Sequence, residues 1–591
     1  MARTERTPLL EQDRTTRGVT FLIVACILGG VVCARLANLQ LAQGDKFLKQ
    51  AEGNRLRIIP HLAPRGVIRD RHGRVLASNR LSYSLALYPI KMPKKKIEEV
   101  IDKLHALLPL DVADVHMKIE KAGYNSTRPI KLVSDIDQKV IAVVAEHQAD
   151  LPGVSIEPDT IRFYPRGHTA VHVIGYTGEV TDSELAADKD EEYHQGDIIG
   201  KGGLERLHDK ELRGEMGSQQ VEVDSRGRPV QVIRNVAAKP GKDLKLFLDL
   251  DMQAVAEKAL DDDKLTGAVV AMNPQTGEVY AMASRPYFDP NIFSRKVKPD
   301  EWKTLQTSNF PFVNRATSAY PPGSIFKIPM TLAALESGRT TENRYFNSTG
   351  SLQVGNRIFH DWSARGFGRV NIVSALQWSI DTVYYQLGVE MGGAIMSRYA
   401  HETGLGEHSG IELGDAAGLV PDPVWKRRVW KDKWWPGDSA NMSIGQGAVI
   451  VTPLQAAVMV SAIANGGKVL VPRLVDDGKP LPPRKVSTWN PKNLALVHKG
   501  MRAVISSGTG TVADIPGKDL AGKTGSAESG KPKTHSWFVC YGPQKNPTIA
   551  VVVFAEAAGH GGTIAGPVAR KVLDQFFGLK EGKIQRVQTI D

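Results

Sequence analysis

An uncharged apolar run near the N-terminus constrains this chain more than any other feature of its sequence. Residues 18–34 carry no charged side chain. A helix needs about 20 apolar residues to cross the hydrocarbon core of a bilayer, and the run lies near the lower limit. Further apolar residues up to Ala42 follow Arg35, whose long side chain can reach the membrane interface. We therefore predict a transmembrane anchor over residues 18–41.

The charges before the run predict its orientation. Positively charged flanks stay on the cytoplasmic side, and four arginines precede the run: Arg3, Arg6, Arg14 and Arg17. Residues 1–17 are thus predicted as a cytoplasmic tail, with the bulk of the chain outside the cytoplasm. A cleaved signal peptide is the competing interpretation, because residues 34–37 (Ala-Arg-Leu-Ala) form an acceptable cleavage site. The length of the run and the absence of a polar stop favour a retained anchor.

Length, charge and cysteine content narrow the remaining choices. A chain of 591 residues is too long for one core, so two or more domains are expected. The net charge of +11 suits an anionic surface such as membrane lipid or a wall polymer. We find no zinc-finger spacing and no aromatic-basic platform, so nucleic acid is not an expected partner. The three cysteines, Cys26, Cys33 and Cys540, cannot build a disulfide framework or a cysteine-rich zinc site, and no metal or cofactor is predicted.

Hydrophobic patterns divide the exported part into two domains. Residues 42–240 mix strand and helix patterns, and a Lys-Pro-Gly-Lys turn at 239–242 marks the boundary. The second domain, residues 241–580, shows strand patterns at 243–249, 266–283, 536–541 and 548–554 and helical spacing at 251–260, 328–335, 372–387 and 568–577. We expect helices around an antiparallel sheet there, followed by a C-terminal tail over residues 581–591. The predicted fold class is α+β multidomain: one transmembrane helix, a mixed α/β pedestal and the helix-covered sheet.

Ser324 and Lys327 form the first candidate catalytic pair. Residues three apart lie on one face of a helix, and Tyr-Pro-Pro-Gly at 320–323 stiffens the approach to the helix start. The helix N-terminus and burial both disfavour an ammonium on Lys327. Lys327 is therefore predicted to act as a neutral base for the Ser324 hydroxyl. The competing interpretation, which this segment alone favours, is an N-capping serine with a solvated lysine one turn on.

A second segment, Lys523-Thr524-Gly525-Ser526, ends a match to the P-loop pattern over residues 517–524. A P-loop needs a buried strand before it and a helix after it. Here Ile-Pro precedes the match, and the glycine- and proline-containing stretch after it is poor helix material. We reject nucleotide binding and predict a strand in which Gly525 allows close backbone approach, paired with the strand at 536–541.

Three ordered motifs resemble a known family. Ser379-Ile380-Asp381, in a helical stretch, means little alone, but it lies between the other two motifs. The set resembles the active-site serine penicilloyl transferases. Residues 435–447 and 452–455 are similar to the family segment between the second and third motifs. Residues 65–73, 162–166 and 203–207 resemble the non-catalytic pedestal of class B penicillin-binding proteins.

Details within the motifs narrow the resemblance. The Tyr-Pro-Pro-Gly-Ser sequence ending at Ser324, and an aspartate at Asp381 where asparagine is commoner, are similar to the elongation type, penicillin-binding protein 2. The chain departs from the pattern at Ser526, where threonine is common. No cysteine lies near the motifs, so a metal site of the kind found in relatives gets no support.

The resemblance implies D,D-transpeptidation of peptidoglycan stem peptides. Ser324 would attack the penultimate D-alanine, with Lys327 as the base. Ser379 would relay a proton between Lys523 and the leaving amine, with Asp381 holding this network or the substrate amide. Lys523 would keep the field positive for a substrate carboxylate. The carboxylate would bind at Thr524, Gly525 and Ser526, and the backbone N–H groups of Ser324 and Ser526 would form the oxyanion hole.

The resemblance also implies partners and a location. β-Lactams would acylate Ser324 as mimics of the D-alanyl-D-alanine end. A membrane glycosyltransferase of the shape, elongation, division and sporulation polymerase family would be the protein partner, at the bacterial cytoplasmic (inner) membrane. Alternatives are a division-type or sporulation transpeptidase, a D,D-carboxypeptidase or β-lactamase, and a non-catalytic scaffold or β-lactam sensor. A bifunctional glycosyltransferase-transpeptidase is disfavoured because residues 42–240 resemble the pedestal.

Overall fold

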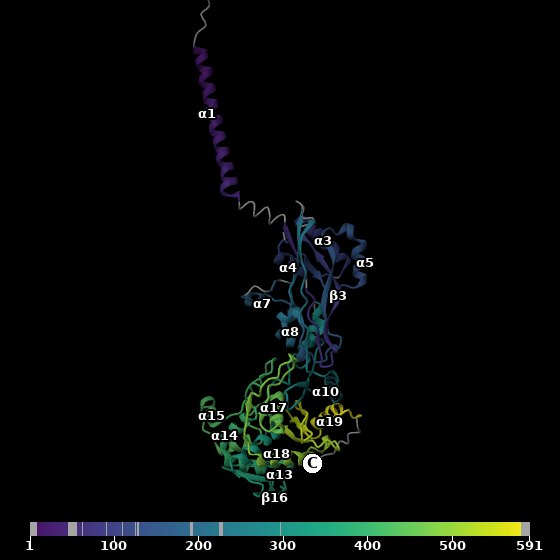
Figure 1. The fold of residues 1–591 in the computed structure, drawn as a ribbon, viewed down its shortest axis with the longest axis vertical. Helices are drawn as coiled ribbons and strands as arrows, with labels where there is room; N and C mark the ends of the chain where they lie inside the picture. The colour runs from purple at the N-terminus through teal and green to yellow at the C-terminus, as the bar shows by residue number, and fades with distance from the viewer. Residues whose placement is uncertain are drawn as a thin grey trace, which may run out of the picture.

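The computed structural model places three parts along one long axis. It describes residues 9–44, 56–61, 63–89, 92–108, 110–124, 126, 129–189, 193–194, 196–223, 229–295 and 297–580. A single helix, α1, stands at one end of the molecule, a strand-rich region lies in the middle, and a domain of helices around a sheet lies at the far end (Figure 1). We call the middle region the pedestal and the far one the C-terminal domain.

The N-terminal helix matches the predicted anchor and extends beyond it. α1 spans Leu9–Ala37 and continues into a π-helical turn, η1, at Asn38–Ala42. The stretch Arg17–Ala42 has a mean hydropathy of 2.4, and none of it is buried against the rest of the chain. A large exposed apolar surface is unfavourable in water and favourable in lipid. This helix is long and apolar enough to cross a membrane.

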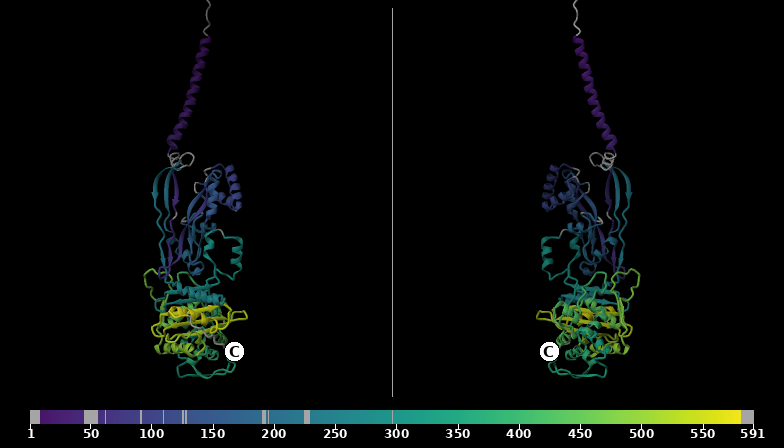
Figure 2. Two further views of the ribbon diagram at one scale, coloured as in Figure 1. Left: turned by 90° about the vertical axis from the view of Figure 1, so that its right-hand side faces the viewer. Right: turned by 90° about the vertical axis from the view of Figure 1, so that its left-hand side faces the viewer.

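Two sheets build the pedestal, and its long strands run lengthwise between α1 and the C-terminal domain (Figure 2). The first is antiparallel, in the order β1 (Leu56–His61), β8 (Gly217–Val223) and β9 (Pro229–Val236). The second has the order β10 (Leu244–Lys245), β2 (Ile68–Arg69), β3 (Val75–Leu87) and β4 (Ile130–Val133), with β5 (Val154–Phe163) also on β3. The predicted strand at 243–249 is therefore two residues long and pairs with the pedestal.

Helices and short strands complete the pedestal. The apolar faces of α3 (Lys94–Leu107), α4 (Val112–Ala122) and α5 (Gln138–Glu146) form one core with β3, β4 and β5. The smaller elements are η3 (Gln148–Asp150), α6 (Val171–Ile174), β6 (Thr177–Glu179), α7 (Asp182–Ala187), β7 (Ile198–Gly200), α8 (Gly203–Leu207) and α9 (Asp209–Arg213).

A five-stranded antiparallel sheet forms the centre of the C-terminal domain, as predicted. Its order is β12 (Val279–Arg285), β11 (Gly267–Met272), β21 (Ile549–Ala555), β20 (His535–Gly542) and β19 (Ala521–Ala527). One face packs on α10 (Leu250–Asp262) and α19 (Ala565–Phe576). The other face belongs to the core that contains α12 (Lys327–Glu336), α14 (Asp381–Glu402), α17 (Pro453–Ala464) and much of α18 (Pro491–Ser507).

The remaining elements surround this core. The helical ones are η4 (Pro290–Ser294), α11 (Pro299–Thr307), η5 (Gly323–Phe326), α13 (Ile372–Gln377), α15 (Pro423–Val429), α16 (Pro436–Ser443) and η6 (Thr511–Ala513). The strands pair as β13 (Tyr345–Ser348) with β16 (Gly368–Asn371), β14 (Ser351–Val354) with β15 (Arg357–His360), and β17 (Lys468–Val469) with β18 (Lys485–Val486).

A buried ion cluster joins the three pedestal segments that the sequence singled out. Glu205 is fully buried and accepts from Arg65 Nε and Arg162 Nε, both at 2.6 Å. Arg65 also reaches Asp209 at 2.7 Å. Although burial works against its charge, Glu205 and Asp209 hold the pKa of Arg65 above its ordinary value. The cluster therefore fixes β5 and α8 to the chain segment before β2.

A second charged group joins the pedestal to the C-terminal domain. Arg74, at the start of the β3 hairpin, donates to Asp70 Oδ2 at 2.8 Å and to Asp251 Oδ1 at 2.7 Å. The backbone N–H of Leu250, the first residue of α10, donates to Asp70 at 3.3 Å. Asp70 thus contacts both the β2–β3 turn and the first helix of the C-terminal domain.

We predict that Glu205→Gln lowers the free energy of unfolding by about 3–5 kcal/mol, because it leaves two buried guanidinium groups without their shared carboxylate. Thermal or denaturant unfolding of the purified protein measures this change. Glu215→Gln is the matched control, since Glu215 pairs with Lys239 on the surface and should cost less than about 1 kcal/mol. Equal effects of the two substitutions would contradict a structural role for the cluster.

Candidate active site

The fold brings the three sequence motifs together. Ser324 lies in the short 3-10 turn η5, and Lys327 is the first residue of α12. Ser379 and Asp381 lie at the junction of α13 and α14, and Lys523 to Ser526 lie in β19. η5 packs against β19, and α12 packs against α14.

Lys327 connects the first motif to the second. Its side chain is fully buried, and its Nζ donates to the Ser379 carbonyl at 2.7 Å, to Ser379 Oγ at 3.2 Å and to Asp381 Oδ1 at 2.5 Å. A buried ammonium is stable only when it is paired and hydrogen-bonded. The interpretation of Ser324 as an N-cap with a solvated lysine is therefore wrong, and no side-chain cap is found at the start of η5 or α12.

Ser379 occupies a break between two helices. The sequence predicted one helix over 372–387, but α13 ends at Gln377 and α14 begins at Asp381. Ser379 has φ +56°, the left-handed region that a serine rarely adopts. The break turns both the carbonyl and the hydroxyl of Ser379 toward Lys327, which a continuous helix would not do.

Asp361 fixes the start of α14 and was not found from the sequence. Its Oδ2 accepts from the backbone N–H of Thr382 at 2.9 Å and from Thr382 Oγ1 at 2.8 Å. The Thr382 hydroxyl also contacts Ser348 Oγ at 2.8 Å. Asp361 lies in the loop after β15, outside every motif, so no sequence spacing connects it to the site.

Lys523 differs from the expectation that it keeps the field positive. Its side chain is fully buried, and its Nζ donates to the Thr524 carbonyl at 2.8 Å. Burial first, and then the positive charge of Lys327, hold the pKa of Lys523 well below its usual value of 10.5, while Asp381 opposes them. A nearby like charge and desolvation both favour the neutral amine. The structure therefore favours a neutral amine at Lys523.

Asp381 completes this charged group. Burial raises the pKa of Asp381, even though Lys327 and Lys523 act in the opposite direction; the nearby Asp361 raises it further. Two lysines and one mostly buried carboxylate thus share one enclosed space. The pKa of Asp381 is raised and that of Lys523 is lowered, so these two groups are suited to exchange a proton.

Glycines allow β19 to lie against η5. A Cβ atom on Gly323, which has φ +55°, would come within 2.4 Å of the Ser526 carbonyl oxygen. A Cβ on Gly525 would lie 2.9 Å from Ile325 Cγ2, and one on Gly561 would lie 2.4 Å from the Gly525 oxygen. The predicted close backbone approach at Gly525 is therefore present, and it places the backbone of β19 beside the turn that carries Ser324.

Hydroxyl groups line the same strand. Thr524 Oγ1 contacts Thr509 Oγ1 at 2.7 Å, and Ser526 Oγ accepts from the backbone N–H of Gly561 at 3.3 Å. Trp537 on β20 donates from Nε1 to the Pro321 carbonyl at 2.9 Å, which fixes the segment before Ser324. Ser324 itself is only half-buried.

An aromatic ring backs the lysine and was also missed. Tyr384 is fully buried, its ring centroid lies 5.2 Å from Lys327 Nζ, and its hydroxyl contacts Thr331 Oγ1 at 2.6 Å. Its position three residues after Asp381, one helical turn on, was the available signal. Among the described residues, no group of three or more His, Cys, Asp or Glu side chains is placed to hold a metal ion.

Two family models match most of the chain. The "Penicillin binding protein transpeptidase domain" matches residues 267–574, and the "Penicillin-binding Protein dimerisation domain" matches residues 60–246. The peptidoglycan D,D-transpeptidase MrdA of Acinetobacter baumannii is 32% identical to this chain, over 96% of the chain and 88% of that protein.

Solved structures of similar proteins share the fold. The penicillin-binding protein PBP2 in its complex with MreC from Helicobacter pylori gives a TM-score of 0.80 at 28% identity, over 88% of this chain and 99% of that one. A chain of a peptidoglycan synthase complex that coordinates polymerization and crosslinking gives a TM-score of 0.71 at 30% identity, over 97% of this chain and 99% of that one.

We predict that Gly323→Ala lowers the free energy of unfolding by about 1–3 kcal/mol more than Gly338→Ala does, because its Cβ clashes with the Ser526 backbone. Both glycines have positive φ, and a Cβ on Gly338 meets nothing within 4 Å. The difference between the two variants in thermal unfolding therefore isolates the close approach of β19 and η5. No difference would show that the two segments are not in contact in solution.

Proposed function

We propose that this chain, which belongs to the penicillin-binding protein family, is a peptidoglycan D,D-transpeptidase of the elongation type. It cross-links stem peptides through an acyl-enzyme on Ser324. The observation that carries the proposal is the hydrogen-bonded group of Lys327, Ser379 and Asp381, drawn from segments far apart in the chain. This group starts one turn after the half-buried Ser324, and the turn that carries Ser324 packs on the edge strand β19 through glycines.

Formation of the acyl-enzyme needs a base beside Ser324. The serine oxygen attacks the carbonyl carbon of the penultimate D-alanine, and its proton passes to Lys327, one helical turn away. Lys327 can accept a proton only as a neutral amine. Asp381, whose Oδ1 lies 2.5 Å from Lys327 Nζ, is the group that takes the proton directly from Lys327. The lowered pKa of Lys523 makes its amine a second proton acceptor in the site. Ser379 relays the proton toward the leaving amine of the terminal D-alanine.

The edge of the sheet supplies the substrate site. β19 is the last strand of the sheet, and an edge strand can pair with an extended peptide through its backbone. The hydroxyls of Thr524 and Ser526 would hold the terminal carboxylate of the stem peptide. Gly525 between them leaves room for Ile325 of the serine turn. The backbone N–H groups of Ser324 and Ser526 would stabilise the oxyanion, a contribution of about 3–4 kcal/mol per donor in a comparable site.

Transfer of the acyl group to an amine distinguishes the proposal from its runner-up. In a transpeptidase the amine of a neighbouring stem peptide attacks the acyl-enzyme, whereas in a D,D-carboxypeptidase water does. The pedestal and the anchor helix favour the transpeptidase, since a small hydrolase needs neither. Product analysis with and without an acceptor peptide separates the two activities.

The anchor helix and the solved relatives support a location and a partner. We place α1 in the bacterial cytoplasmic membrane as a single pass, with the pedestal and the C-terminal domain outside the cytoplasm. The similar PBP2 was solved with MreC, and the other similar chain belongs to a synthase that couples polymerization to crosslinking. A membrane glycosyltransferase of the shape, elongation, division and sporulation polymerase family is therefore the proposed partner of this chain.

We predict that a fluorescent penicillin labels the purified protein and that Ser324→Ala removes the label, because the penicillin carbonyl replaces the D-alanine carbonyl. Lys327→Ala should slow labelling by at least about 100-fold, the usual range for loss of a general base. Gel fluorescence measures both. Ser337→Ala, beyond the C-terminal end of α12, is the control and should label normally. Labelling that persists in Ser324→Ala would refute the proposal.

The lowered pKa of Lys523 predicts a pH dependence. If its neutral amine takes part in proton transfer, the rate of penicillin acylation rises with pH and levels off well below pH 10.5, the ordinary lysine value. Lys523→Arg stays charged and should lack this rise. Asp381 opposes the lowering, so Asp381→Asn should shift the midpoint to lower pH. A rate that does not change with pH, or a shift in the opposite direction, contradicts the assignment.

A further inference from the structure

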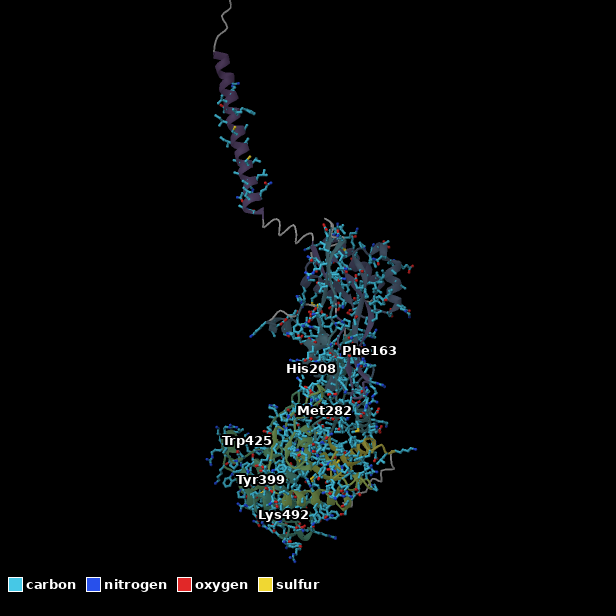
Figure 3. All side chains as sticks on the ribbon, viewed as in Figure 1. Phe163, His208, Met282, Tyr399, Trp425 and Lys492 are labelled. Carbon is cyan, nitrogen blue, oxygen red and sulfur yellow. The ribbon has the colours of Figure 1, made fainter. Side chains whose placement is uncertain are left out.

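An aromatic and basic surface lies on the C-terminal domain, outside the three motifs. Residues 425–435, at α15 and in the segment after it, contain four tryptophans and five lysines or arginines. Figure 3 shows Trp425 at the outer edge of this domain. No aromatic-basic platform was predicted from the sequence, and residues 425–435 correct that prediction. We call residues 425–435 the tryptophan surface.

Buried contacts hold the tryptophan surface in place. Trp434 donates from Nε1 to Ser439 Oγ at 2.8 Å and packs on Gly393, where a Cβ would lie 2.6 Å from its ring. Lys426 is buried and pairs with Asp438 at 2.6 Å and Asp432 at 3.0 Å. Asp432 therefore already has Lys426 as its ion-pair partner. The surface is a built platform and does not depend on a partner to form.

Two tryptophans and several basic side chains form the exposed part of this surface. Trp430 and Trp435 remain 53% and 47% exposed. The exposed basic side chains Arg427, Arg428 and Lys431 form no ion pair with any carboxylate of the described residues. Lys433 Nζ lies 3.7 Å from the Trp435 ring centroid. The surface therefore offers flat apolar faces together with uncompensated positive charge.

The tryptophan surface adjoins the segment that carries Ser324. A hollow of about 40 Å³ lies between Trp425, Trp430 and residues 446–448. The preceding residue, Gly445, accepts a hydrogen bond from the Gly323 N–H at 3.1 Å. Residues 445–448 therefore connect a ligand on this surface to Gly323, the residue before Ser324.

We propose that the tryptophan surface binds an anionic glycan strand, the polysaccharide that carries the stem peptides. The apolar faces of pyranose rings pack flat on indole rings. The basic side chains pair with carboxylates, which are those of the stem peptides or the lactyl carboxylates of units that carry no stem peptide. A lipid surface has similar chemistry, but α15 lies in the domain farthest from α1 (Figure 1). The inference rests on the proposed function, since it names what holds the substrate strand near Ser324.

The experiment uses the full-length protein in detergent and two probes. The first probe is fluorescently labelled glycan strands from which an amidase has removed the stem peptides, a hydrolysis that leaves a free lactyl carboxylate on each unit. The second is vesicles of anionic phospholipid. Test variants are Trp430→Ala combined with Trp435→Ala, and Arg427→Gln combined with Arg428→Gln and Lys431→Gln. Controls are Trp302→Ala, an exposed tryptophan on α11, and a triple Lys95→Gln, Lys96→Gln and Lys139→Gln on the pedestal.

We expect each test variant to weaken glycan binding by at least about tenfold in Kd, the effect of losing a few central aromatic or charged contacts. The charge variant should also lose most of the salt dependence of binding. The controls should bind as the unaltered protein does. Penicillin labelling of Ser324 is measured in parallel and should stay unchanged in every variant. Absence of labelling in the unaltered protein would contradict the proposed function, whatever the glycan binding shows.

Two results would overturn the inference. One is glycan binding that is equal in the test variants and the controls. The other is a loss of vesicle binding in the test variants while they still bind the glycan. That result would show that the surface binds lipid. Loss of glycan binding with normal penicillin labelling supports the inference.

Discussion

The rest of the site depends on the hydrogen bonds of the buried Lys327 side chain. A charged lysine removed from water is tolerated only if acceptors surround it, and here one carbonyl, one hydroxyl and one carboxylate do so. These acceptors belong to the junction of α13 and α14, so α12 and α14 must pack side by side for the lysine to be stable. The same contact holds Ser379 in its left-handed conformation and sets Asp381 between two lysines.

Glycine residues let the edge of the sheet form the other half of the site, because they have no side chain to keep the backbones apart. Gly323, Gly525 and Gly561 lie where the backbones of η5, β19 and the segment before α19 approach one another. Any side chain there would separate the serine turn from the edge strand. The pedestal acts at a greater distance: its ion cluster around Glu205 and the Asp70 contacts to α10 make one continuous body from the pedestal to the C-terminal sheet (Figure 2). The serine therefore lies in a domain that the pedestal separates from the anchor helix (Figure 1).

Local patterns in the sequence predicted the parts of the fold that depend on local physics. The apolar run predicted α1, two shorter apolar runs predicted β20 and β21, and the poor helix material after Lys523 ruled out a P-loop. Features that depend on tertiary contacts were missed or misread. The helical spacing of 372–387 continues across the break at Ser379, because only burial of Lys327 requires that break. The lowered pKa of Lys523 depends on its burial and on the nearby Lys327. Asp361 joins the site from a loop with no motif.

Identification of the atom that penicillin acylates tests the central claim most directly. The protein is incubated with a β-lactam, denatured and digested, and the modified peptide is sequenced by mass spectrometry. The account predicts a single penicilloyl group on the peptide that contains Ser324, at the hydroxyl of that residue. An adduct on Ser379 or Ser526, or no adduct on a folded protein, would contradict the assignment of Ser324 as the nucleophile.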